Sequence, residues 1–192
     1  MSNTFFMPNK SEVGTGALKT AIGQIASLGC KKALVVTDQI LAKVGTLKML
    51  TDLLDGSGVA YEIYDGTRPN PTCGDVETGV ALVQKHKCDM IISLGGGSIH
   101  DCAKGIGVVA TNGGDIRDYE GVDQTTKPPL PLVSVNTTAG TGAEMTRFCI
   151  ITDEERKVKM AIIDWRISPL IAVNDPLLTE SMPKGLTAAD RS

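Results

Sequence analysis

Three consecutive glycines, Gly95, Gly96 and Gly97, followed by Ser98 are the residues whose types and spacing most directly suggest chemistry. Glycine has no Cβ, so the backbone can turn tightly and approach a ligand closely. If a helix begins after the glycines, its first N–H groups and the positive end of its dipole would favour a phosphate. Short glycine motifs also occur in structural turns between a strand and a helix. A phosphate-binding loop is therefore favoured, with a structural turn as the alternative.

The residues after the glycines limit this interpretation in two ways. Ser98 and Asp101 have the spacing of a capping box, so we expect Ser98 to cap the helix that follows. The G-x-G-x-x-G fingerprint is incomplete because His100 stands in place of its third glycine, and the chain contains no Walker A motif. The sequence therefore indicates a nucleotide-binding fold of another type, or a fold that binds no nucleotide.

Asp38 is a second candidate, because it directly follows a short apolar run at residues 33–37. A carboxylate at the end of a strand can bind a ribose 2′-hydroxyl and would repel a 2′-phosphate, which favours NAD over NADP if a dinucleotide binds. Aspartate is also a preferred N-cap, and an expected helix begins close to Asp38. Both interpretations remain open.

Hydroxyl groups are concentrated in another loop, at residues 137–142. Its threonines could surround a second part of a ligand, or Thr141 could form a capping box with Glu144. Lys159 lies in an alternating strand and could reach a phosphate or a ribose, although most lysines in strands are simply solvated. Taken alone, neither feature identifies a site.

The chain contains two histidines, His86 and His100. His86 is expected at a solvated helix end, and His100, at the start of a helix, is expected to be partly exposed. Two distant histidines without a nearby acidic cluster make a poor metal site. No spacing of serine, histidine, cysteine and aspartate indicates a catalytic arrangement, so neither a metal ligand nor a catalytic residue is predicted.

Apolar runs that alternate with helical patterns would position these residues. Strands are expected at residues 2–8, 33–37, 59–64, 90–94, 132–135 and 170–173, and helices at 17–28, at 40–54 and from Thr72 onward. A β-hairpin is expected at 148–152 and 158–163, and a surface loop at 111–129. This alternation predicts an α/β fold with a doubly wound, mostly parallel, Rossmann-like sheet and a β-hairpin.

In such a sheet, ligands bind at the carboxyl ends of the strands, near the point where the strand order reverses. Asp38, Asn70, residues 95–98 and residues 136–141 all follow expected strands. These loops should therefore lie along one edge of the sheet, and their convergence is a stronger indication of a ligand site than any single loop.

The composition excludes several classes of protein. The 192 residues include 19 basic and 22 acidic side chains, a formal charge of -3, and no basic tract, so a nucleic-acid partner is not expected. The five cysteines contain no C-x-x-C pair, which indicates reduced thiols and a cytoplasmic protein. A signal peptide and a membrane-spanning run are not expected either.

The combination of motifs resembles the iron-containing, group III alcohol dehydrogenases. The matching segments are Asp38 and residues 66–71, 95–104, 136–144, 174–176 and 182–189. The resemblance extends from about residue 5 to residue 189 and is closest to the bacterial members that oxidise ethanol and diols.

The resemblance implies how the loops are used. It places the pyrophosphate of NAD at the glycine loop and the adenosine ribose at Asp38. The residues implied around the cofactor are Asp38, Asn70, Gly95, Gly96, Gly97, Ser98, Thr137, Thr138, Thr141, Phe148, Lys159 and Leu178.

The family pattern is not complete in this chain. Family members are about twice as long, and their helical second domain supplies one aspartate and three histidines to Fe(2+), whereas Asp190 does not match a ligand position. We therefore expect a dinucleotide-binding domain at residues 1–180 and a truncated start of the helical domain at 181–192. An apolar face left by the missing domain would favour self-association.

The expected function is the NAD-binding half of an oxidoreductase that transfers hydride between NAD and a primary alcohol or aldehyde. Homo-oligomerisation is also expected, and the isolated chain is expected to be inactive. A nucleotide-binding module without catalysis and a relative acting on glycerol or a diol remain alternatives.

Overall fold

The computed structural model describes residues 10–138 and 142–180. The strand expected at residues 2–8, Thr141, and the family motif at 182–189 lie outside the described residues. The boundary expected at residue 180 is likewise not tested.

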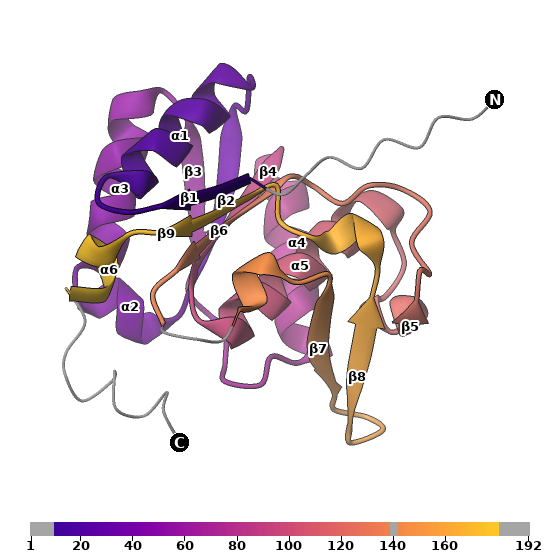
Figure 1. The fold of residues 1–192 in the computed structure, drawn as a ribbon. Coiled ribbons are helices and arrows are strands. Elements are labelled where there is room, and N and C mark those ends of the chain that lie inside the picture. The colour runs from indigo at the N-terminus through magenta and orange to yellow at the C-terminus, as the bar shows by residue number, and fades with distance from the viewer. Residues whose placement is uncertain (1–9, 139–141, 181–192) are drawn as a thin grey trace.

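A six-stranded sheet forms the centre of the molecule (Figure 1), and every strand pair in it is parallel. Its strand order is β1 (Lys10–Val13), β9 (Ile171–Asn174), β6 (Leu132–Asn136), β4 (Met90–Gly95), β2 (Lys32–Val36) and β3 (Ala60–Tyr64). The expected parallel, doubly wound sheet is confirmed. The edge strand β1 was not predicted, because its sequence KSEV is mostly exposed and lacks an apolar run.

Helices cover both faces of this sheet (Figure 1), with α1 (Ala17–Ser27) and α3 (Thr46–Ser57) on one face and α4 (Cys73–His86) and α5 (Gly97–Asn112) on the other. Alternate side chains of the buried strands divide between the two cores. Leu34 and Ile91 pack with α4 and α5, whereas Val35 and Ile92 pack with α1 and α3. The nearly continuous apolar runs of β2 and β4 follow from this double coverage.

The single helix expected at residues 40–54 is wrong, because the structure has two helices there. Helix α2 (Gln39–Lys43) ends before Gly45, which adopts a left-handed φ of 86° and is the N-cap of α3. Helical spacing continues across this break, so periodicity alone did not show it. By contrast, the expected start of α4 is confirmed, since Thr72 and Asp75 form a complete capping box.

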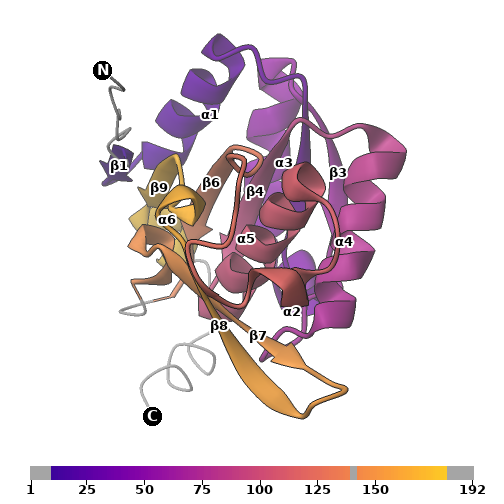
Figure 2. The ribbon, with the colours of Figure 1, turned by 90° about the vertical axis from the view of Figure 1, so that its right-hand side faces the viewer.

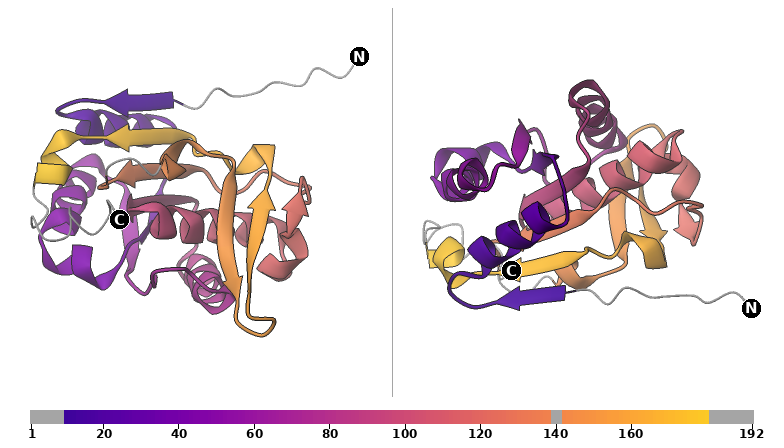
Figure 3. Two further views of the ribbon diagram at one scale, coloured as in Figure 1. Left: turned by 60° about the horizontal axis from the view of Figure 1, so that its bottom comes forward. Right: turned by 90° about the horizontal axis from the view of Figure 1, so that it is seen from above.

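A second sheet contains the predicted hairpin, β7 (Phe148–Asp153) and β8 (Val158–Ile163), with the short strand β5 (Gly121–Val122) beside β8. The hairpin projects from the body of the molecule (Figure 2), and its strands run across the direction of the central strands (Figure 3). Its inner side chains Cys149, Ile151, Met160 and Ile162 are buried in the same core as α4 and α5. The hairpin is therefore packed directly against the helix that begins at the glycine loop.

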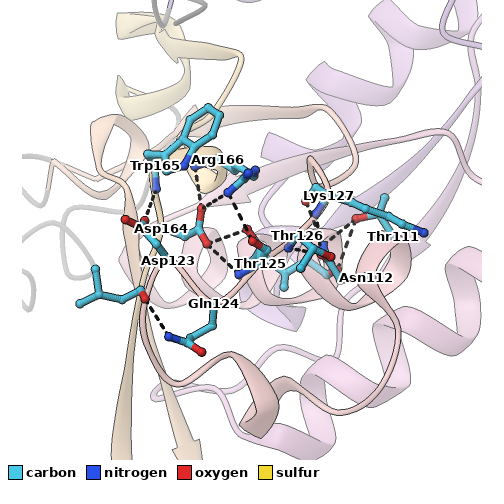
Figure 4. A network of polar contacts seen from close by, with 12 residues as sticks. Thr111, Asn112, Asp123, Gln124, Thr125, Thr126, Lys127, Asp164, Trp165 and Arg166 are labelled. Atoms are coloured by element: carbon cyan, nitrogen blue, oxygen red, sulfur yellow. Dashed lines mark hydrogen bonds and ion pairs between the residues drawn. The ribbon is translucent and has the colours of Figure 1, made fainter. Parts of the chain in front are cut away.

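The region expected to be a surface loop, residues 111–129, is more ordered than predicted. It contains the end of α5, the 3-10 turn η1 (Ile116–Tyr119) and β5. Two polar side chains, Asp164 and Asn112, hold residues 125–127 of this region in place (Figure 4). The Asp164 carboxylate accepts bonds from the N–H and hydroxyl of Thr125 at 3.0 and 2.6 Å, and Asn112 Oδ1 accepts bonds from the N–H groups of Thr126 and Lys127.

The remaining elements are the 3-10 turns η2 (Ala143–Met145) and η3 (Trp165–Ile167) and helix α6 (Pro176–Glu180). All five cysteines are free, as expected. No helix in the described part of the chain is both long and apolar enough to cross a membrane.

Candidate functional site

The glycine loop joins β4 to α5, and two of its glycines are required by their surroundings. Gly95 has a φ of 151°, and a Cβ there would lie 2.2 Å from Ile99 Cδ1. A Cβ on Gly96 would lie 2.9 Å from Thr138 Cγ2, so the backbone passes close to the next loop along the sheet edge. These contacts explain why a side chain is excluded from both positions.

The expected capping box of Ser98 and Asp101 is wrong. Helix α5 begins two residues earlier than expected, at Gly97, with Gly96 as an N-cap that supplies no side-chain bond. Asp101 instead accepts a bond from the Ile150 N–H of β7 at 3.3 Å. The spacing was misleading because the partner of Asp101 is distant in sequence.

This uncapped start leaves hydrogen-bond donors available. The N–H groups of Ile99 and His100 donate to the Gly96 carbonyl, each at 3.1 Å. The N–H groups of Gly97 and Ser98 have no acceptor among the described residues, and both residues are partly exposed. Two N–H groups without an acceptor among the described residues, at the N-terminus of a 16-residue helix, form an arrangement that favours an anion.

Three elements bring polar side chains together beside these donors. Asn70, in the loop before α4, has a left-handed φ of 55°, and its N–H donates to Ser98 Oγ at 3.4 Å. Lys159 of β8 donates from Nζ to Asn70 Oδ1 at 3.2 Å. The structure thus brings together Asn70, Ser98 and Lys159, which are far apart in sequence, and adds a cation to the glycine loop.

Asp38 lies at the carboxyl end of β2, and its N-cap interpretation is confirmed. One carboxylate oxygen, Oδ1, accepts a bond from the Leu41 N–H at 2.8 Å. The other oxygen has no partner among the described residues, and the side chain is partly exposed. Capping of α2 therefore leaves half of the carboxylate available to a ligand.

The loop after β6, which was expected at the ligand edge, is held by two asparagines that were not among the predicted cofactor residues. Asn136 Oδ1 accepts bonds from the N–H and the hydroxyl of Thr138 at 3.1 and 3.0 Å, and its Nδ2 donates to the Thr138 carbonyl and to Asn174 Oδ1. The Thr137 N–H donates to the Gly95 carbonyl at 3.1 Å, so this loop lies against the glycine loop. A usable signal existed, since both asparagines end an apolar strand.

The remaining candidates differ in their surroundings. Phe148 opens the hairpin and is 44% exposed, as a ligand contact would require. Leu178 is fully buried in the core beneath α1 and α3. Thr141 lies outside the described residues.

His100 was expected to be partly exposed, but it is completely buried. Its Nδ1 lies 2.7 Å from Ser93 Oγ, which in turn donates to Ser134 Oγ. Burial lowers its pKa to about 3, and the nearby charge of Lys104 acts in the same direction. Within residues 10–138 and 142–180, no group of three histidine, cysteine, aspartate or glutamate side chains could hold a metal ion.

The candidate residues follow the order of neighbouring strands. Asp38 follows β2, the glycine loop follows β4, and Thr137 and Thr138 follow β6. An extended ligand along this edge would meet a carboxylate, then an anion-binding helix terminus with a lysine, then a hydroxyl-rich loop. The fold and this order define a doubly wound α/β protein with a Rossmann-like sheet.

Comparison with known proteins identifies the family. The iron-containing alcohol dehydrogenase model matches residues 8–176, so the chain belongs to that family. It is 50% identical over 187 residues to alcohol dehydrogenase 4 of Schizosaccharomyces pombe, covering 97% of this chain and 44% of that protein. It is 44% identical to the NAD-dependent methanol dehydrogenase of Bacillus methanolicus, covering 96% and 49%.

The fold comparison agrees with the sequence comparison. The crystal structure of a 1,3-propanediol oxidoreductase superposes with a TM-score of 0.91 at 43% identity, covering 99% of this chain and 50% of that one. The chain spans about half the length of the curated relatives it matches. The expected family and the Rossmann-like fold are therefore confirmed.

Proposed function

We propose that this chain binds NAD and is the cofactor-binding half of an oxidoreductase that interconverts a primary alcohol and its aldehyde. The observation that carries the proposal is the pair of N–H groups on Gly97 and Ser98 that have no acceptor among the described residues, with the Lys159 ammonium close by. Membership of the iron-containing alcohol dehydrogenase family and the NAD-dependent relative support the reaction class.

Each part of NAD has a matching set of groups on this edge. The pyrophosphate would accept bonds from the Gly97 and Ser98 N–H groups and would be attracted by Lys159. The free oxygen of Asp38 would accept a bond from the adenosine ribose. The second nucleotide would then lie on the β6 side, beside Thr137, Thr138 and Phe148, with Asn70 bracing the phosphate site.

The family description includes iron, but the described residues do not fit a metal site, so no step through Fe(2+) is assigned to them. NAD, when bound, accepts or returns the hydride. We propose that residues corresponding to the other half of the longer relatives complete the active site, and that this 192-residue chain alone does not turn over. A cytoplasmic location and homo-oligomerisation remain proposals; the free cysteines support the former.

The test is calorimetric titration of the chain with NAD and with NADP. We expect tighter binding of NAD, because the Asp38 charge repels a 2′-phosphate. Asp38→Asn removes that charge and keeps a good N-cap, so it should reduce the NAD preference about tenfold without loss of α2.

The matched control is Asp52→Asn, which changes the net charge equally on an exposed helix face where Asp52 pairs with Lys48. Its preference should equal that of the unmodified chain. Equal binding of the two cofactors by the unmodified chain would contradict the role of Asp38, and binding of neither would contradict the proposed function.

A further inference from the structure

Lys104 of α5 is a buried cation, and its hydrogen bonds to the described residues all go to one short segment. It is only 2% exposed. Its Nζ donates to the Ala143 carbonyl at 2.8 Å, to Thr146 Oγ1 at 3.0 Å and to the Phe148 carbonyl at 3.0 Å. An ammonium group has three N–H donors, and these three acceptors use all of them.

The acceptors of Lys104 are neutral oxygens, and no ion pair of Lys104 occurs among the described residues. Burial lowers the pKa of Lys104, and the nearby carboxylates of Asp101 and Glu144 oppose that shift. A buried ammonium is costly, and an apolar side chain of similar volume would fill the same core more cheaply. The retained cation therefore points to a positional requirement in the segment it holds.

That segment, residues 143–148, connects the threonine loop to the first strand of the hairpin. It contains η2 and ends at Phe148, which is exposed and opens β7. Asp101, one turn before Lys104, adds a bond to the Ile150 N–H. Two side chains of α5 thus hold residues 143–150 in place.

The same helix begins with the free N–H groups of Gly97 and Ser98. A helix is a rigid element, so α5 fixes the distance between the anion site at its first turn and the segment held by Lys104 two turns later. The anion site belongs to the middle of an extended ligand, and residues 143–148 lie on its β6 side. Lys104 therefore links two parts of one site.

We propose that Lys104 is a positioning residue that holds residues 143–148 where the second nucleotide of a dinucleotide binds. The inference rests on the proposed NAD-binding function. Its consequence is selective: loss of Lys104 should weaken ligands that extend past the pyrophosphate and spare ligands that end there. ADP fills only the β2 and β4 part of the edge, whereas NAD continues toward β6.

The experiment compares NAD and ADP affinities by calorimetry for the unmodified chain and for Lys104→Met, which keeps the length and apolar volume of the side chain. We expect NAD affinity to fall tenfold or more and ADP affinity to stay within twofold. Lys104→Gln retains two donors and should show a smaller loss in the same direction. If Lys104→Met does not fold, Lys104→Gln is used for the same comparison of NAD and ADP affinities.

The matched control is Asp89→Ala at the amino ends of β2 and β4, away from the proposed site. Asp89 accepts bonds there from the N–H groups of Lys31 and Lys32 at 2.8 and 3.0 Å. This variant should lower the stability while leaving the ratio of NAD to ADP affinity unchanged. A merely structural role of Lys104 predicts the same behaviour for both variants, and that result would overturn the proposal.

Amide hydrogen exchange supplies a readout that needs no ligand. In Lys104→Met, exchange at residues 143–150 should accelerate at least tenfold, whereas exchange in β4 should not. Unchanged exchange at residues 143–150 in Lys104→Met would overturn the proposal, whatever the affinities for NAD and ADP. If the unmodified chain bound neither ligand, the proposed function would fail; if it bound both and the variants kept the affinity ratio, only the Lys104 inference would fail.

Discussion

At the scale of single residues, the site combines atoms that are already bonded with atoms that remain available. Asp38 Oδ1 accepts a bond from the Leu41 N–H, and the other carboxylate oxygen has no partner among the described residues. Asn136 uses its whole amide group to hold Thr138 and Asn174. The two interpretations of Asp38 are therefore compatible, while Asn136 acts as a support for the residues beside it.

Gly95 and Gly97 should respond differently to substitution. Gly97 is the first residue of α5 and does not have a left-handed φ, so Gly97→Val should leave the fold intact. The added side chain would occupy the space above the free N–H groups, so NAD affinity should fall at least a hundredfold by calorimetry. A folded Gly97→Val chain that bound NAD normally would show that this loop is not the phosphate site.

Gly95→Val is the contrasting variant. Its φ of 151° is unfavourable for valine, and its Cβ would lie 2.2 Å from Ile99 Cδ1. We expect it to lower the free energy of unfolding by about 3 kcal/mol or more in urea titration. If both variants had the same stability, the distinction between a conformational and a steric requirement would be wrong.

At the scale of elements, local patterns predicted what local interactions determine. The apolar runs of β2, β4, β6 and β9, the hairpin and the capping box of α4 all follow from neighbouring residues. The failures involve partners distant in sequence. Asp101 bonds to Ile150, His100 is buried against Ser93, and Lys104 holds residues 143–148, none of which a spacing rule shows.

The candidate site shows the same division. Its position at the carboxyl edge of the sheet and its glycine loop could be predicted from the strand ends. The contacts among Asn70, Ser98 and Lys159 could not, because they depend on how the hairpin folds back over the loop before α4. The selection of Lys159 came from the family resemblance, since most strand lysines are solvated.

The contact between α5 and β7 should make stability depend on pH. Burial raises the pKa of Asp101 from 3.8 to about 6, although Lys104 and the Ile150 N–H oppose the shift. The folded state therefore binds this proton more tightly than the unfolded state, so stability falls as pH rises from about 4 to about 6. Asp101→Asn stays neutral and should be more stable than the unmodified chain at pH 7, by up to about 3 kcal/mol, and nearly equal at pH 4.

The measurement is urea unfolding of both chains at pH 4, 5, 6 and 7, with the difference in free energy plotted against pH. Groups common to both chains cancel in this difference. Asp52→Asn, on the exposed face of α3, should give no comparable slope between pH 4 and 6. A pH-independent difference for Asp101→Asn would contradict the raised pKa.

At the scale of the whole molecule, two sheets share one core. The inner face of the hairpin packs with α4 and α5, which also cover one face of the central sheet. Polar contacts add to this packing: Arg117 pairs with the buried Asp153 at 3.1 Å, and the Thr152 N–H donates to the Pro71 carbonyl at 2.8 Å. The second sheet is therefore part of the same folded unit as the glycine loop.

NAD bound between the glycine loop and Lys159 would join the two sheets through the ligand itself. A ligand that binds only the folded state stabilises it by about 2.7 kcal/mol at a concentration of 100 Kd. Because Lys159 belongs to β8, we expect NAD to slow amide exchange in β7 and β8 as well as at residues 95–100. Exchange measured with and without saturating NAD tests this expectation.

Lys159→Met should remove most of the protection in the hairpin while residues 95–100 remain protected at saturating NAD, because the Gly97 and Ser98 N–H groups still bind the pyrophosphate. The matched control is Lys157→Met, which removes another exposed lysine from the turn of the same hairpin. If the control lost hairpin protection equally, the overall charge of the hairpin would explain the effect. Retention of full protection in Lys159→Met would instead show that the core shared with α5 couples the two sheets, and that Lys159 does not contact the ligand.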